Sequence, residues 1–288
     1  MKTSTLRSHA SHVAPKFGHA LKARVLEGLE AGEFCMAYQG IYRVDTGELA
    51  QMEALLRWHH PEFGLLLPGA FHEALADEEV MVSVTDFVMN AVSLDIATWH
   101  ASGGATYPVA INVPPSVAAS EGFADRLDAV CRDHGIGPAS IEVELSESQD
   151  LARFPSIAKV VQRLRARGVN VAMDDFGTGF ACLAALGPIN FGTVKIAKEL
   201  LAEAPRNPDA RTVFSSVLAL MARLKLSVVV EGVETAAQAQ WLAQWPHALA
   251  QGFYLARPVF GMGSVPGARL ARPAKVSRHR SVPLADAA

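Results

Sequence analysis

The sequence is poor in cysteine and has no long apolar run, and each shortage argues against a class of protein. Its 288 residues include only three cysteines, which lie far apart and form no CxxC pair. This argues against a disulfide framework or a zinc finger and fits a reducing, cytoplasmic location. No stretch of eighteen apolar residues occurs, so we predict no membrane span. The first twenty residues lack the apolar segment of a signal peptide.

A strong charge of one sign and a phosphate-binding loop are also missing. The net charge of -3 predicts no general attraction to nucleic acid or to a membrane surface. No glycine-rich loop of the Rossmann or P-loop type follows the first strand-like segments, and no serine sits on a nucleophile elbow. A basic stretch at 275–280 leaves DNA binding by the C-terminal end as a weaker alternative, because no helix-turn-helix signal accompanies it.

What the sequence does contain is an alternation of short apolar strands and amphipathic helices. Strand patterns occur at 34–41, 48–57, 107–113, 141–145, 169–174, 193–196, 227–231 and 248–254. Helix patterns occur at 20–31, 81–99, 124–134, 155–167, 210–224 and 236–245. Eight strands in one continuous domain favour a closed β/α barrel over an open doubly wound sheet. We expect this domain to span 20–265, between flexible tails at 1–19 and 266–288.

Polar residues stand at the ends of these apolar strands. Asp174 and Asp175 follow the buried-strand pattern at 169–173 and begin a glycine-hinged loop. Two adjacent carboxylates repel, and burying them is costly unless a cation lies between them. A lone pair of this kind would suit a solvated turn equally well. Six other strand ends carry polar residues, however, namely Glu53, Asn112, Glu144, Lys195, Glu231 and Gln251.

In a β/α barrel the strand ends meet at one mouth, so these side chains are expected to converge. Oxygen donors of this kind select Mg²⁺ or Mn²⁺. Several carboxylates suit two cations about 3.5–4 Å apart, an arrangement that cleaves phosphodiesters. Taken singly, Glu144 could be an exposed strand residue, Lys195 an edge lysine and Gln251 a helix cap. His59 and His60 are expected to be surface or loop residues, because Pro61 follows them.

Several motifs together make the sequence similar to the EAL domains, the bacterial phosphodiesterases of cyclic di-GMP. Glu53-Ala-Leu matches the family's signature, and Tyr-Gln39 matches its YQP motif with Gly40 in place of the proline. DDFGTG at 174–179, EGVET at 231–235 and QGF at 251–253 match three further motifs. The resemblance runs from about residue 20 to residue 259. It implies a modified TIM-type (β/α)8 barrel in which one strand is antiparallel to the others.

The resemblance also implies roles for individual residues. The metal ligands would be Glu53, Asn112, Glu144, Asp174 and Asp175, with Asp174 bridging two ions. Lys195 would activate the attacking water, and Glu231 would assist it within the metal–water network. The substrate contacts would be Gln39, Arg57 and Gln251, with Arg57 facing a phosphate. Glu147 would anchor the loop after Asp175, and Glu234 would support the site. The implied reaction opens cyclic di-GMP to linear pGpG, in a protein that often dimerises.

One departure from the family pattern leaves two hypotheses open. Where the family usually has Lys-Ile-Asp, this chain has Lys195, Ile196 and Ala197, so a carboxylate beside the lysine is lost. The first hypothesis is a Mg²⁺- or Mn²⁺-dependent cyclic di-GMP phosphodiesterase. The second is a catalytically impaired regulator that binds cyclic di-GMP or a protein partner and controls gene expression, virulence or motility.

Overall fold

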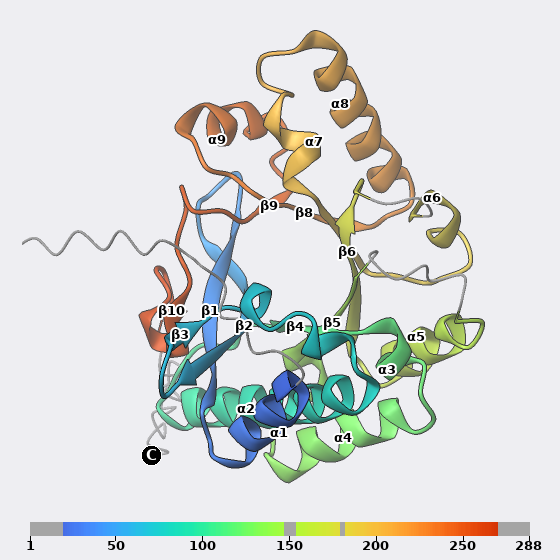
Figure 1. Ribbon diagram of the computed structural model, residues 1–288. Helices are drawn as coiled ribbons and strands as arrows, with labels where there is room; N and C mark the ends of the chain where they lie inside the picture. The colour runs from blue at the N-terminus through green and yellow to red at the C-terminus, as the bar shows by residue number, and fades with distance from the viewer. Residues whose placement is uncertain (1–19, 147–153, 179–181, 270–288) are drawn as a thin grey trace, which may run out of the picture.

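Eight strands close into a barrel in the computed structural model of the protein, which describes residues 20–146, 154–178 and 182–269 (Figure 1). They are β1 (Phe34–Arg43), β2 (Leu49–His60), β4 (Val109–Val113), β5 (Ile141–Ser146), β6 (Asn170–Phe176), β7 (Thr193–Ile196), β8 (Ser227–Val230) and β9 (Leu249–Ala250). The barrel closes because β1 pairs with both β2 and β9. The short strands β3 (Gly64–Leu66) and β10 (Val259–Phe260) extend the sheet beyond it.

Strand direction separates β1 from the rest of the barrel. It is antiparallel to both of its neighbours, whereas β2 and β4 to β9 are parallel from one to the next. The predicted β/α barrel with one antiparallel strand is therefore confirmed. Because seven strands point the same way, their carboxyl ends gather at one mouth.

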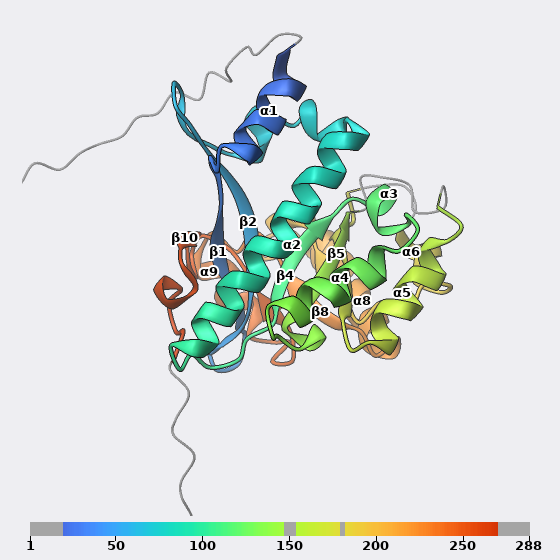
Figure 2. The ribbon, with the colours of Figure 1, turned by 90° about the horizontal axis from the view of Figure 1, so that it is seen from below.

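Helices cover the outside of the barrel. They are α1 (Leu21–Glu30), α2 (Glu78–Ala101), α3 (Pro115–Ala118), α4 (Phe123–Asp133), α5 (Ile157–Ala166), α6 (Cys182–Ala185), α7 (Lys198–Ala202), α8 (Pro208–Arg223) and α9 (Ala236–Leu242). Figure 2 shows α2, α4 and α5 side by side over one flank, while Figure 1 shows α7, α8 and α9 together over another. The six predicted helices are confirmed. The additional α3, α6 and α7 have four or five residues each, too few to show a helical period.

Helix α2 is apolar for a reason that lies inside the fold. Among the described residues it is the one helix long and apolar enough to cross a membrane by length and composition. One face of it, with buried residues that include Val80, Val88 and Ile96, belongs to the core, and the helix packs on β1 and β4. Asp95 on the same helix accepts a hydrogen bond of 2.5 Å from the Tyr38 hydroxyl of β1. The hydropathy of α2 is thus that of a core helix.

Alternation along the strands divides the molecule into two interiors. On β4, Val109, Ile111 and Val113 join the apolar layer between sheet and helices. Residues of the opposite parity line the inside of the barrel, because successive side chains of a strand point to opposite faces. That inner lining is polar at many positions, including the buried Glu53 and Glu144. The fold therefore collects the strand-end polar residues in one enclosed place.

At two edges of the fold the structure differs from what the sequence led us to expect. His60 is not a surface or loop residue: it ends β2, is 5% exposed, and its Nδ1 accepts from the backbone N–H of Glu62 at 3.1 Å. The turn begins only at Pro61. At the other end, the segment expected as a C-terminal tail begins with contacts to the barrel. The Tyr42 hydroxyl donates to the Pro266 carbonyl at 3.0 Å, and the Ala105 N–H donates to the Arg269 carbonyl at 2.8 Å.

Candidate active site

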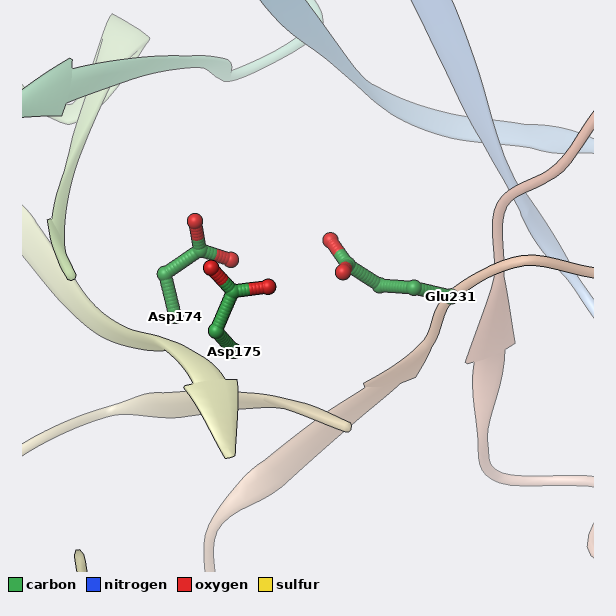
Figure 3. Close-up of side chains that lie close together, drawn as sticks. All are labelled: Asp174, Asp175 and Glu231. Atoms are coloured by element: carbon green, nitrogen blue, oxygen red, sulfur yellow. The ribbon is translucent and has the colours of Figure 1, made fainter. Parts of the chain in front are cut away.

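A bulge in β6 turns two adjacent carboxylates toward the same space. The register between β6 and β7 shifts between Met173 and Phe176, and Asp175 has a φ of 56°, in the left-handed region. In a regular strand Asp174 and Asp175 would point to opposite faces, but the bulge inserts an extra residue. Figure 3 shows both side chains on the same side of the strand, facing Glu231. Each of these three residues offers an oxygen within 4.8 Å of the other two.

Lys195 lies at the centre of the mouth, with 1% of its side chain exposed. Its Nζ lies 2.8 Å from Glu231, 3.0 Å from Glu144, 3.0 Å from Asp174 and 3.6 Å from Glu53. Burial alone would lower the pKa of this ammonium, but the surrounding carboxylates outweigh burial and raise the pKa well above its usual value. One side chain thus holds together the ends of four other strands.

Amide side chains orient the Glu53 carboxylate. Asn112 Nδ2 donates to one of its oxygens at 3.1 Å, and Gln251 Nε2 donates to the other at 2.6 Å. Gln251 Nε2 also donates to Gln39 Oε1 at 3.1 Å, and Gln39 Nε2 donates to the Ala256 carbonyl at 2.9 Å. Burial would raise the pKa of Glu53, but the charge of Lys195 and these donors lower it. The carboxylate is therefore fixed in its ionised form.

The site holds more negative charge than Lys195 can balance. Its five carboxylates are Glu53, Glu144, Asp174, Asp175 and Glu231. Burial raises the pKa of Glu144 well above its usual range and the pKa of Glu231 to about 7. Burial, followed by the charge of Asp174, also raises the pKa of Asp175. Oxygen Oε1 of Glu144 is buried and accepts no hydrogen bond.

These observations fit divalent cations. Five carboxylates against one ammonium leave an excess of four negative charges when all are ionised, and two divalent cations would balance it. The donors are carboxylate and amide oxygens, the ligands that Mg²⁺ and Mn²⁺ prefer. An unpaired buried carboxylate oxygen is costly unless a cation or donor reaches it. Of the predicted ligands, Glu53, Glu144 and Asp174 lie within 4 Å of Lys195 and Asn112 donates to Glu53, while Asp174 and Asp175 form with Glu231 a group whose oxygens lie close enough together to hold a metal ion.

The remaining predicted residues fall at the rim or outside the site. Arg57 is 9% exposed and lies four positions along β2 from Glu53, and its Nη1 donates to the Leu56 carbonyl at 2.8 Å. Glu234 is exposed in the loop before α9, and no ion pair among the described residues joins it to the cluster. Glu147 lies outside the described residues, so its predicted role as a loop anchor stays a prediction.

The two departures from the family pattern have different structural settings. Gly40 lies against the Tyr42 side chain, and a Cβ at this position would overlap the Tyr42 hydroxyl. Ala197 is 1% exposed and follows the end of β7 as the residue before α7, with φ of -59° and ψ of 148°. Its side chain gives α7 no capping hydrogen bond. An aspartate at position 197 would therefore both cap α7 and bring a carboxylate close to Lys195.

Sequence reasoning missed an apolar pocket of about 380 Å³ beside Asn112. Its walls include Ala54, Leu56, Pro68 and Pro114, and Ser146 also lines it. The signal available in the sequence was proline just beyond strands, at 68 after β3 and at 114–115 after β4. Pro114 and Pro115 follow β4, which ends at the mouth, and they indicate a rigid wall next to Asn112.

Comparisons with known proteins agree with this geometry. A family model described as EAL domain matches residues 22–258. The chain is 34% identical over 239 residues to the cyclic di-GMP phosphodiesterase RocR of Pseudomonas aeruginosa, covering 82% of this chain and 60% of RocR. It is 30% identical over 233 residues to the bifunctional diguanylate cyclase/cyclic di-GMP phosphodiesterase MucR of the same organism, covering 81% of this chain and 34% of MucR. The chain thus spans about a third of the length of MucR.

A solved structure described as the MucR phosphodiesterase in complex with c-di-GMP shares the fold. It superimposes with a TM-score of 0.76 at 29% identity, covering 83% of this chain and 97% of that one. The barrel of this chain therefore has the same fold as that solved domain.

Proposed function

Because this chain belongs to the EAL domain family, we propose that it is a cyclic di-GMP phosphodiesterase that yields linear pGpG. The observation that carries the proposal is the mouth of the barrel, where four carboxylates contact Lys195, a fifth lies beside Asp174 and Glu231, and two amides hold Glu53. RocR and MucR, both similar over four fifths of this chain, are described as cyclic di-GMP phosphodiesterases. Clusters of carboxylate and amide oxygens suit Mg²⁺ or Mn²⁺, and we propose one of these cations for this site.

The side chains at the mouth would have different roles in hydrolysis. Divalent cations held by Glu53, Asn112, Glu144, Asp174 and Asp175 would lower the pKa of water and screen the charge of the phosphate. The protonated amine of Lys195 lies among four carboxylates. With divalent cations bound by those carboxylates, the pKa of Lys195 would be lower, and its Nζ would orient the attacking water and take its proton. Glu231, 2.8 Å from Nζ, would assist that transfer.

The pocket beside Asn112 supports a substrate with an aromatic base. Its walls are mainly apolar and include three prolines, which suit the flat faces of a guanine. Arg57 on β2 would pair with a phosphate. Gln39 and Gln251 lie on the far side of Glu53 and would complete the contacts to the nucleotide.

Ala197 favours a second candidate function. Without a carboxylate at this position, the site has one acidic side chain fewer than the usual family pattern near Lys195. A protein with this change would bind cyclic di-GMP, or a protein partner, and regulate gene expression, virulence or motility through that contact. We favour the enzyme because the sequence keeps all five predicted metal ligands, Glu53, Asn112, Glu144, Asp174 and Asp175.

One assay separates these functions. Purified protein is incubated with cyclic di-GMP and either Mg²⁺ or Mn²⁺, and bound nucleotide and released pGpG are measured in the same sample. We expect product in the presence of at least one metal, and none with Lys195→Met. Tight binding without product from the folded protein would favour the regulator and reject the enzyme.

The variant Ala197→Asp sharpens the comparison. If it converts an inactive binder into an active hydrolase, the natural chain is the regulator; a change of less than about threefold means that this chain hydrolyses without the missing carboxylate. A homodimer and a cytoplasmic location also remain predictions, to be tested by light scattering and cell fractionation.

A further inference from the structure

A second polar layer lies inside the barrel beneath the metal site. Its centre is Glu142 on β5, which is 2% exposed and lies two residues before Glu144. No Lys, Arg or His among the described residues forms an ion pair with it. Neutral donors satisfy it instead. Gln51 Nε2 donates to one carboxylate oxygen at 3.0 Å, and Thr193 Oγ1 donates to the other at 2.9 Å.

Asn170 connects this layer to the outside of the barrel. Its Nδ2 donates to Glu142 and, at 2.9 Å, to Thr193 Oγ1. Its Oδ1 accepts from Arg165 Nη1 of α5 at 3.2 Å. The charge of Glu142 is thus linked to an arginine through one amide. We name Gln51, Glu142, Asn170 and Thr193 the lower layer.

Small residues make room for the lower layer. Ala110 on β4 is the register partner of Glu142 on β5, and its short side chain leaves room for Gln51 of β2 to reach the Glu142 carboxylate. A Cβ on Gly192 would overlap Asn170 Oδ1 and Arg165 Nη1. The chain therefore keeps glycine at the one position where any side chain would break the link.

The lower layer repeats the strand order of the metal site. Gln51 precedes Glu53 by two residues, Glu142 precedes Glu144 by two, Thr193 precedes Lys195 by two, and Asn170 precedes Asp174 by four. On one strand, residues two apart share a face and lie about 6.6 Å apart. Hydrogen bonds in the lower layer therefore fix how far β2, β5, β6 and β7 slide past one another, directly beneath the groups that must converge.

We propose that the lower layer is a set of positioning residues for the metal ligands. It holds β2, β5, β6 and β7 in the register at which Glu53, Glu144 and Asp174 can bind cations together. All three partners donate to the Glu142 carboxylate. A glutamine at position 142 would place its NH₂ group, itself a donor, against one of these donors, and that hydrogen bond would be lost. Removal of groups that orient metal ligands by hydrogen bonds typically weakens metal binding by about 10–100-fold, and the lower layer would act on the same ligands through the strands that carry them. The inference rests on the proposed metal site, and it does not require that the chain hydrolyses cyclic di-GMP.

The test measures Mn²⁺ binding by titration calorimetry on folded full-length protein, well below the melting temperature. Two variants disturb the layer by different means: Glu142→Gln changes its acceptor, and Gly192→Ala displaces Asn170 without changing a polar residue. We expect each to raise the Kd for Mn²⁺ about tenfold or more. With cyclic di-GMP present, kcat at low Mn²⁺ should fall and recover at saturating Mn²⁺.

Two controls separate positioning from general loss of stability. Tyr38→Phe removes the buried hydrogen bond to Asp95 outside the barrel, and Gly137→Ala adds a methyl group where nothing lies within 4 Å. Both should leave the Kd for Mn²⁺ unchanged, even where Tyr38→Phe lowers the melting temperature.

The outcomes of the test are distinct. An unchanged Kd in both lower-layer variants, or a wild-type protein that binds no Mn²⁺, overturns the inference. Normal Mn²⁺ binding with weakened variants but no hydrolysis by the wild type rejects the proposed enzyme alone and supports the positioning role.

Discussion

Asp175 combines an unusual backbone with an unfavourable neighbour. Its φ of 56° is one that residues with a Cβ seldom adopt, and its carboxylate lies beside Asp174. Asparagine and glycine tolerate this region better than other residues, and aspartate follows asparagine. Strain of this kind persists where the rest of the fold enforces it, and it concentrates at functional sites. The residue is therefore kept for its carboxylate.

Substitution of Asp175 should separate stability from metal binding. We expect Asp175→Asn to keep or raise the melting temperature without divalent cations, because repulsion from Asp174 is removed. The same variant should lose most Mn²⁺-dependent stabilisation. Differential scanning calorimetry with and without Mn²⁺ measures both effects.

A matched control for Asp175 lies on the surface. Lys225, with a φ of 58°, is exposed and precedes β8, whereas Glu231 of the cluster follows the other end of that strand. Lys225→Gly should stabilise the fold by about 1 kcal/mol by relieving the left-handed backbone, without changing the response to Mn²⁺. A clear loss of stability in Asp175→Asn would contradict this account.

Glu231 makes the stability of the protein depend on pH. Its folded pKa of about 7 exceeds its ordinary value of 4.5, so the folded state binds more protons than the unfolded state between these values. Its contribution is therefore fully present below about pH 4.5 and is lost as the pH rises through about 7. Urea unfolding in EDTA from pH 5 to 8 should show this loss, and Glu231→Gln should flatten the curve. A wild-type curve that rises over the same range would refute the assignment.

At the scale of elements, close approach between the last two strands of the barrel depends on Gly252. A Cβ at this position would overlap the backbone of Val233 in the loop after β8. The Val233 N–H donates to the Gln251 carbonyl at 3.0 Å, so the two segments are already in contact. This contact sets where Gln251 meets Glu53.

Gly252→Ala should therefore damage both fold and site. We expect a loss of about 1–3 kcal/mol in the free energy of unfolding, because the added methyl group overpacks a backbone contact. The phosphodiesterase activity of Gly252→Ala should fall below that of Gln251→Ala. Chemical denaturation and the phosphodiesterase assay provide the measurements, with Gly137→Ala as a control expected to be neutral. Wild-type stability in Gly252→Ala would show that the loop can move aside.

The short elements show where sequence patterns stop being informative. The predicted strand at 193–196 agrees with β7 at both ends, whereas the predicted 248–254 shrinks to Leu249–Ala250. β3 and β10 were not predicted, because two or three residues cannot display an alternation and exist as strands only through their partners. Asp77 and Asn207 cap α2 and α8 by accepting backbone N–H bonds, which places both helix starts two or three residues before the predicted ones.

At the scale of the whole molecule, closure of the barrel concentrates negative charge in one buried place. Binding of divalent cations there should stabilise the folded protein, because the unfolded chain lacks the site. At a Mn²⁺ concentration of one hundred times Kd we expect a gain of about 2.7 kcal/mol. Thermal melting with Mn²⁺, and its reversal by EDTA, measures this gain. Asp174→Asn should show little of it, and an equal gain in that variant would place the cations elsewhere.

The sequence by itself determined the types of most elements and the chemistry of the site. Apolar periodicity marks strands and helices locally, and the residue types at strand ends already specify oxygen ligands and one ammonium. The tertiary structure decided what depends on distance: the bulge that turns Asp175 beside Asp174, the burial of His60, and the pairing of Lys195 with four carboxylates. It also placed Glu142 among neutral donors, since no local pattern records which strands become neighbours when the barrel closes.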